Sequence, residues 1–134
     1  MNKSLTERLF EECPLIYRTN SDGTQTIVNR REFECGDGWF DTIYQLSTKI
    51  ESIAKEMQQN GTPISGLPQV RQVKEKFGGL RFYMNRSTEE IEELIQQASL
   101  QASVTCECCG EAGYKQATSS GWIMVVCDNC AREY

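Results

Sequence analysis

The sequence predicts an α+β fold in which amphipathic helices pack on an antiparallel hairpin, followed by a C-terminal module built on four cysteines. Three observations support this prediction. Two segments repeat apolar residues at the helical spacing of three and four, a glycine pair divides a β-prone stretch, and two Cys-x-x-Cys pairs lie near the C-terminus. We expect a core over residues 1–104 and the cysteine module over residues 105–134, packed on that core.

Composition places the chain among ordinary globular proteins. Its 134 residues include 39% hydrophobic and 25% charged residues, which suits one compact core with a small additional module. No apolar run approaches the roughly 20 residues that span a bilayer, and the first ten residues lack a signal-peptide pattern. We therefore expect no membrane association and a cytoplasmic protein, in which cysteines are reduced or bound to metal.

Charge and the missing histidines restrict the classes of function. The formal net charge of -5 argues against unspecific coating of nucleic acid, although a local basic patch escapes that average. The chain contains no histidine, so every catalytic arrangement built on imidazole is absent. We expect a protein that is not an enzyme.

The N-terminal third is predicted to hold one short helix followed by extended chain. Ser4 and Glu7 have the spacing of a capping box, and Pro14 ends the helix expected over residues 4–13. Residues 15–34 contain two β-prone pieces around the turn sequence Ser21-Asp22-Gly23, so we expect extended structure there.

Two amphipathic helices follow from periodicity. The first starts near Trp39 and stops at Asn60-Gly61; the second starts after a capping box at Ser87 and Glu90 and runs to about Ser103. Prolines and glycines make residues 62–68 a loop between them. The apolar positions are Trp39, Ile43, Leu46, Ile50, Ile53, Ala54 and Met57 in the first helix, and Ile91, Leu94, Ile95, Ala98 and Ala102 in the second.

The stretch "PQVRQVKEKFGGLRFYMN" predicts a β-hairpin. With Gly78-Gly79 as a two-residue turn, Phe77 pairs with Leu80 and Lys76 pairs with Arg81. Because side chains alternate along a strand, the hairpin then has two distinct faces. Val73, Phe77, Leu80, Phe82 and Met84 form a core face that also includes Glu75, and Lys74, Lys76, Arg81 and Tyr83 form a basic face.

The expected Lys76 and Arg81 pair carries like charges, which destabilises a hairpin unless an anion lies nearby. One explanation is internal: the segment "TEEIEEL" supplies Glu89, Glu90, Glu92 and Glu93 to cover the basic face, or water simply solvates it. The other is an external anion, such as a phosphate of a nucleic acid or nucleotide or an acidic protein surface, with Tyr83 as a stacking surface.

The two cysteine pairs form the most specific motif. Cys106-x-x-Cys109 and Cys127-x-x-Cys130 are separated by 17 residues, a spacing typical of four thiolates around one tetrahedral Zn²⁺. Gly110 permits the tight knuckle after the first pair, and the insert between the pairs predicts a hairpin. Because protein sulfurs fill all four positions, we expect a structural zinc ion in a zinc ribbon or a treble clef. These two differ in whether Cys130 begins a helix.

The other cysteines have no assigned metal role. Cys108 either replaces Cys106 or Cys109 as a ligand or lies beside the metal without binding it, and the sequence leaves this open. Cys13 and Cys35 are isolated in the sequence, so we expect them to be small buried residues.

Asp37 and Asp41 lie four residues apart where the first long helix begins. Carboxylates at this place interact favourably with the positive end of the helix dipole, and we expect Asp37 to cap the helix. The alternative is a divalent-metal site of a metal-dependent nuclease, which is disfavoured because carboxylates from one helix start do not make a two-metal site.

The strings "CGDGWF", "QVKEKFGGLRFY", "CECCG" and "GWIMVVCDNC" together resemble small uncharacterised proteins encoded by bacteriophages and prophages. The resemblance covers roughly residues 33–131 and supplies no catalytic residues. It implies a phage-encoded modulator or inhibitor of a host protein of defence or replication, acting in the bacterial cytoplasm. Binding of nucleic acid or a phosphorylated small ligand through the basic hairpin face is the alternative that the residues themselves suggest.

Overall fold

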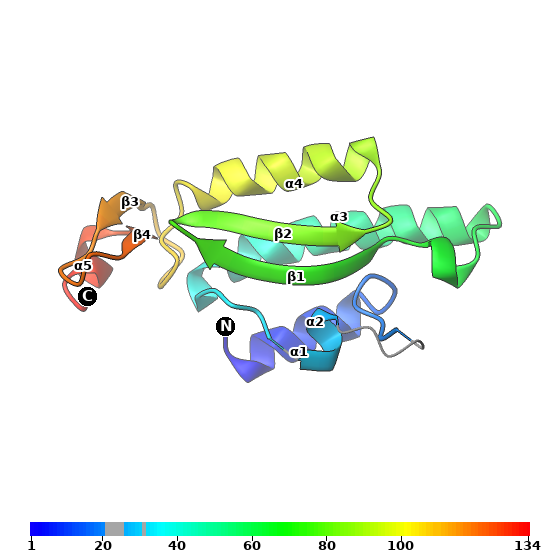
Figure 1. Cartoon of the computed structure of the whole chain (residues 1–134), viewed down its shortest axis with the longest axis horizontal. Helices are drawn as coiled ribbons and strands as arrows, with labels where there is room; N and C mark the ends of the chain where they lie inside the picture. Colours follow the sequence, from blue (N-terminus) through cyan, green and yellow to red (C-terminus); the bar gives the residue numbers. More distant parts are fainter. Residues whose placement is uncertain (21–25, 31) are drawn as a thin grey trace.

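The computed structural model describes residues 1–20, 26–30 and 32–134 (Figure 1). It combines helices with antiparallel hairpins and a C-terminal cluster of four cysteines, which confirms the predicted fold class. The elements are α1 (Lys3–Glu12), α2 (Ile27–Arg30), η1 (Asp37–Trp39), α3 (Phe40–Gln59), η2 (Ile64–Gly66), β1 (Gln69–Lys76), β2 (Gly79–Asn85), α4 (Glu89–Ala102), β3 (Tyr114–Ala117), β4 (Ile123–Val126) and α5 (Asp128–Ala131).

The β1–β2 hairpin forms the middle of the molecule, and helices surround one of its faces. In Figure 1, α4 runs along β2, α3 lies behind the hairpin, and α1 and α2 lie on the side of β1. The core between these elements contains, among others, Leu9, Trp39, Ile43, Ile50, Val73, Leu80, Phe82 and Ile91, all buried. The four cysteines lie at one end of the molecule, with β3, β4 and α5.

The predicted helices are present, and their first residues differ from the expected caps. The backbone N–H of Leu5 donates to Asn2 Oδ1, so Asn2 caps α1 instead of the Ser4 box. Similarly, the N–H of Ile91 donates to Thr88 Oγ1, so α4 begins one residue after the expected Ser87 cap. Asn caps a helix as well as Ser does, and Thr only somewhat less well, so the capping-box spacing predicted each helix but not its first residue.

The extended structure expected over residues 15–34 is wrong where the structure describes this segment. Ile27–Arg30 form α2, and only Glu34 pairs in strand fashion, through an isolated parallel bridge to Lys74. Burial of Ile27 against the core outweighs the β propensity of the segment. The expected turn at Ser21-Asp22-Gly23 lies outside the described residues.

The hairpin has a different register from the predicted one. Phe77 and Gly78 form the turn, with φ values of 52° and 79°, and Lys74 pairs with Arg81 instead of with Tyr83. The expected Gly78-Gly79 turn is therefore wrong by one residue, and Phe77 is 67% exposed instead of belonging to the core. The observed register sets Val73 opposite Phe82, which pairs two buried side chains across the strands.

The strands keep the predicted faces despite this slip, because both strands still alternate with a period of two. One irregularity is added: the register shifts between Val70 and Gln72, so Arg71 is the extra residue of a bulge at the start of β1.

In the described part of the chain, none of the helices is both long and apolar enough to cross a bilayer.

Candidate metal centre and basic hairpin face

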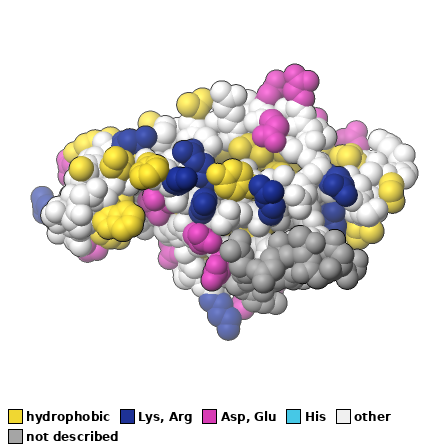
Figure 2. Space-filling model, viewed as in Figure 1, with side chains coloured by type: hydrophobic (Ala, Val, Ile, Leu, Met, Phe, Trp, Pro, Cys, Tyr) yellow, Lys and Arg dark blue, Asp and Glu magenta, His cyan; other side chains and the backbone are white. Residues whose placement is uncertain are grey.

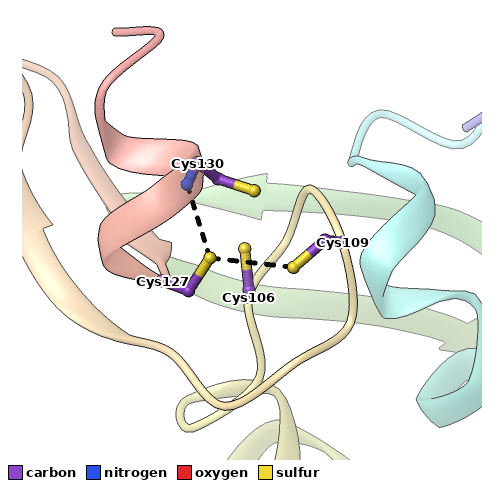
Figure 3. A group of neighbouring side chains, drawn as sticks. All are labelled: Cys106, Cys109, Cys127 and Cys130. Atoms are coloured by element: carbon purple, nitrogen blue, oxygen red, sulfur yellow. Dashed lines mark hydrogen bonds between the residues drawn. The ribbon is translucent and has the colours of Figure 1, made fainter.

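Four cysteine side chains converge at one point (Figure 3). The Sγ atoms of Cys106, Cys109, Cys127 and Cys130 all lie within 4.8 Å of one another, and those of Cys109 and Cys127 are 3.7 Å apart. Sulfurs that bind one tetrahedral ion at about 2.3 Å are separated by about 3.8 Å. A disulfide needs about 2.05 Å. The spacing of the four free thiols therefore fits a metal ion and not a pair of disulfides.

Local backbone structure explains how each pair reaches this point. After the first pair, Gly110 adopts a left-handed φ of 84°, and its N–H donates to the carbonyl of Cys106 at 2.9 Å, which closes a tight knuckle. The second pair lies at the end of β4. Cys127 is the N-cap of α5, and the N–H of Cys130 donates to Cys127 Sγ at 3.4 Å. Cys130 lies within this single helical turn instead of beginning it, so the zinc ribbon and the treble clef both remain compatible with the structure.

The electrostatics of the cluster favour a bound cation. Burial raises the pKa of the Cys106 thiol, but backbone N–H groups of Cys127, Cys109 and Cys108 stabilise its thiolate more strongly and lower this pKa to about 6. The hydrogen bond with Cys127 raises the pKa of the Cys130 thiol. Four thiolates so close together repel one another, and a divalent cation offsets this repulsion. The cluster can therefore hold a metal ion.

The knuckle docks on the segment Gly36–Trp39, which lies about 70 residues earlier. The N–H of Gly38 donates to the carbonyl of Glu107 at 2.8 Å, and the indole Nε1–H of Trp39 donates to the carbonyl of Thr105 at 2.9 Å. The N–H of Gly36 donates to the Glu107 carboxylate at 3.0 Å. Burial raises the pKa of that carboxyl. These bonds attach the cysteine module directly to the start of α3.

Both glycines of this segment are required by close approach. A Cβ on Gly38 would lie 2.2 Å from the carbonyl oxygen of Cys106 and 2.6 Å from the backbone nitrogen of Gly110. A Cβ on Gly36 would lie 2.3 Å from the carbonyl oxygen of Glu107. The "GDGW" string is therefore a docking surface for the knuckle, a role that sequence analysis missed. Its only sequence signal is a pair of glycines outside any predicted turn.

The two aspartates next to this segment act separately. Asp37 does not cap α3 as expected; its carboxylate accepts hydrogen bonds from the N–H and Nδ2 of Asn2, at 2.6 and 3.0 Å, and so links α1 to η1. Asp41 is exposed in the first turn of α3 and lines, with Lys49, a cavity of about 400 Å³ between α3 and α4. Among the described residues, the cysteine cluster is the one group of three or more side chains placed to hold a metal ion, and neither aspartate belongs to it.

The remaining cysteines lie outside the cluster. Cys108 Sγ is 3.3 Å from the Tyr134 hydroxyl and is not one of the four converging sulfurs. Cys13 and Cys35 are buried, and burial raises the pKa of each thiol to about 12. They are small core residues, as the sequence indicated.

The basic face of the hairpin, which consists of Lys74, Lys76, Arg81 and Tyr83, points away from the helices. Figure 2 shows Lys and Arg side chains gathered across the middle of this face, over the hairpin. Arg81 lies opposite Lys74, two residues before the Lys76 that was expected to pair with it. The bulge adds Arg71, whose guanidinium lies 5.7 Å from the Tyr83 ring centre, with Lys74 Nζ at 6.0 Å. Sequence analysis missed Arg71 because strict alternation excludes it.

No carboxylate covers these cations in the part of the chain that the structure describes. There, the one ion pair within 4.0 Å is Arg8 with Glu12, far from the hairpin. Glu34 is joined to Lys74 by an isolated β-bridge, which is a contact between their backbones. Glu89, Glu90, Glu92 and Glu93 of α4 are exposed and form no such pair. Cover by the glutamates of "TEEIEEL" is therefore not seen, and the alternative of solvation fits the described residues, in which Arg71, Lys76 and Arg81 are exposed and Lys74 is half-buried.

Comparisons with protein-family models, with curated proteins and with solved structures find no match to this chain. The resemblance to phage-encoded proteins stays a prediction, and the function has to be argued from the two sites alone.

Proposed function

We propose that the chain is a non-enzymatic, zinc-containing protein that binds nucleic acid. One structural Zn²⁺ held by Cys106, Cys109, Cys127 and Cys130 stabilises the fold, and the basic hairpin face contacts phosphate groups. Modulation of a host protein, the function that the phage resemblance implies, has no supporting observation among the described contacts. We therefore place nucleic acid first.

Zinc is the metal that this donor set favours. A tetrahedral site of four thiolates suits zinc or iron, and one with short cysteine spacings and no open position is typical of structural zinc. The Sγ separation of 3.7 Å between Cys109 and Cys127 supports this geometry. Native mass spectrometry of protein grown with zinc and iron tests the identity of the metal: a mass increase of one zinc supports the proposal, and iron alone or no metal contradicts it.

The observation behind nucleic-acid binding is a set of solvent-facing cations on one sheet face of an acidic protein. Among the residues that the structure describes, Arg71, Lys74, Lys76 and Arg81 have no ion-pairing carboxylate within 4.0 Å, while the whole chain has a formal charge of -5. Lys74 opposite Arg81 destabilises the hairpin by itself, since like charges across strands repel. A phosphate between them removes that repulsion and adds charge-assisted hydrogen bonds.

Fluorescence anisotropy with labelled oligonucleotides tests this proposal. We expect Lys74→Gln with Arg81→Gln to reduce the salt dependence, measured as the slope of log K against log salt, by about 1.4, since each phosphate contact on a single strand contributes about 0.7. The matched control is Lys49→Gln with Lys55→Gln, which removes the same charge from α3. The proposal fails if the intact protein binds no oligonucleotide at 50 mM salt, or if the control variant weakens binding equally.

A further inference from the structure

The tip of the β1–β2 hairpin touches the cysteine module. A Cβ built on Gly78, in the hairpin turn, would lie 3.2 Å from Lys115 Cε and 3.6 Å from Ile123 Cγ2. Lys115 belongs to β3 and Ile123 to β4, the hairpin between the two cysteine pairs. The basic hairpin face therefore continues onto the module, and Lys115 extends its row of cations.

Large side chains are unusually exposed around this junction. Phe77, in the hairpin turn, is 67% exposed, and Trp122, which directly precedes Ile123, is 70% exposed. Ile123, which lies at the hairpin tip, is 40% exposed. In Figure 2, hydrophobic side chains gather at the β3–β4 end of the face, next to the Lys and Arg side chains. A soluble protein exposes such a group of large apolar side chains mainly where a ligand covers it.

Cations lie beside two of the rings on the hairpin, Tyr83 and Phe77. Lys76 Nζ lies 5.8 Å from the centre of the Phe77 ring, just as Arg71 and Lys74 approach Tyr83. Because the core of a protein–protein interface is depleted of lysine, although it is enriched in arginine and aromatic residues, this group of cations and rings suits a protein partner less well. It suits a strand of nucleic acid, which offers phosphates and flat bases in turn, provided that the bases are not already stacked inside a duplex.

We propose that the ligand is single-stranded nucleic acid, with bases stacked on Tyr83, Phe77 and Trp122 and phosphates held by the neighbouring cations. This inference rests on the proposed function and adds the form of the ligand to it. The row of cations sets the expected salt dependence. Five phosphate contacts, through Arg71, Lys74, Lys76, Arg81 and Lys115, give a slope of about -3.5, or about a 100-fold loss of affinity between 50 and 200 mM salt.

Tryptophan fluorescence reports base stacking directly. The chain has two tryptophans, and Trp39 is fully buried while Trp122 is 70% exposed, so a stacked base quenches the emission of Trp122. We expect a 12-nucleotide poly(dT) strand to quench this emission and to bind at least tenfold more tightly than a DNA duplex of equal length at the same salt. Trp122→Phe should abolish the quenching.

Phe77→Asn tests stacking without endangering the fold. Phe77 has a φ of 52° and precedes Gly78, and Asn-Gly is the preferred sequence for a turn with two left-handed residues. We expect single-strand affinity to fall about 5- to 150-fold, the effect of removing one stacking partner, while duplex affinity stays unchanged. Ile64→Asn, which removes an exposed side chain from η2, is the matched control and should bind as the parent does.

The possible results separate the two proposals. If strand and duplex bind equally, without quenching, but Lys74→Gln with Arg81→Gln still weakens both, phosphate binding stands and base stacking is overturned. If neither nucleic acid binds, the proposed function is overturned together with this inference. Both proposals are supported if the protein binds single strand more tightly than duplex, if the strand quenches Trp122 emission, and if Phe77→Asn weakens this binding.

Discussion

Gly38→Ala should loosen the attachment of the cysteine module to the core. The new Cβ would lie 2.2 Å from the Cys106 carbonyl oxygen, whereas ordinary contact begins at 3.4 Å, so the knuckle must withdraw by about 1 Å. Movement in that direction also stretches the 2.8 Å hydrogen bond from the Gly38 N–H to the Glu107 carbonyl.

The size of the effect follows from these two losses. Forcing an extra carbon into a packed site costs about 1–3 kcal/mol. Losing one backbone hydrogen bond costs about 1 kcal/mol more. We therefore expect the free energy of unfolding of the zinc-bound protein to fall by about 3 kcal/mol. If removing the metal already releases the knuckle, Gly38→Ala lowers the stability of the metal-free protein by less than it lowers that of the zinc-bound protein. The difference between the two free energies appears as a weaker affinity for zinc.

Urea unfolding with and without zinc, together with competition against a chromophoric chelator, measures both quantities. Gly66→Ala is the matched control, because its Cβ would lie 3.3 Å from the Thr62 methyl group and its φ is not left-handed. It should change stability by well under 1 kcal/mol, as an ordinary surface substitution does. Wild-type stability and zinc affinity in Gly38→Ala would refute the docking argument.

Two further predictions concern the cysteines and a buried acid. Cys109→Ser should abolish stoichiometric metal binding and unfold residues 105–134, whereas Cys108→Ser should retain one metal ion. Metal analysis measures the binding, and circular dichroism measures the folding. Equal behaviour of the two variants would contradict the ligand set. Glu51→Ala should cost about 2–4 kcal/mol in urea unfolding, since the buried Glu51 carboxylate accepts from the backbone amides of residues 15 and 16, while Glu56→Ala on the exposed side of α3 should cost little.

The long helices could be predicted from the sequence because their apolar spacing is a local property of the chain. Ile43 and Ile50 recur at helical steps and lie in the core, as expected. The cysteine spacing is equally local, and it brought four sulfurs together within 4.8 Å. The predicted caps differ from the observed caps, Asn2 and Thr88, by two residues and one residue. Several adjacent polar residues can cap a helix, and tertiary contacts determine which of them does so.

The hairpin register and the docking segment depend on distant contacts and could not be predicted. Gly78-Gly79 is a sound local turn, yet the strands place Phe77 at a positive φ because this sets Val73 against Phe82. The bulge that adds Arg71 is likewise set by packing. The glycines of "GDGW" matter only because the backbone of residues 106–110 comes to lie against them, and no pattern within "GDGW" records that neighbour.

One short segment connects the two sites. The N–H of Glu34 donates to the Val73 carbonyl and the Glu34 carbonyl accepts from Glu75, so this residue is bonded to β1, the strand that carries Lys74 and Lys76. Only a few residues later, Gly38 is bonded to the knuckle through Glu107. If loss of the metal frees the knuckle, the segment that also supports the edge of the basic face loses one of its two attachments. For this reason, chelation should weaken oligonucleotide binding even though no cysteine belongs to that face.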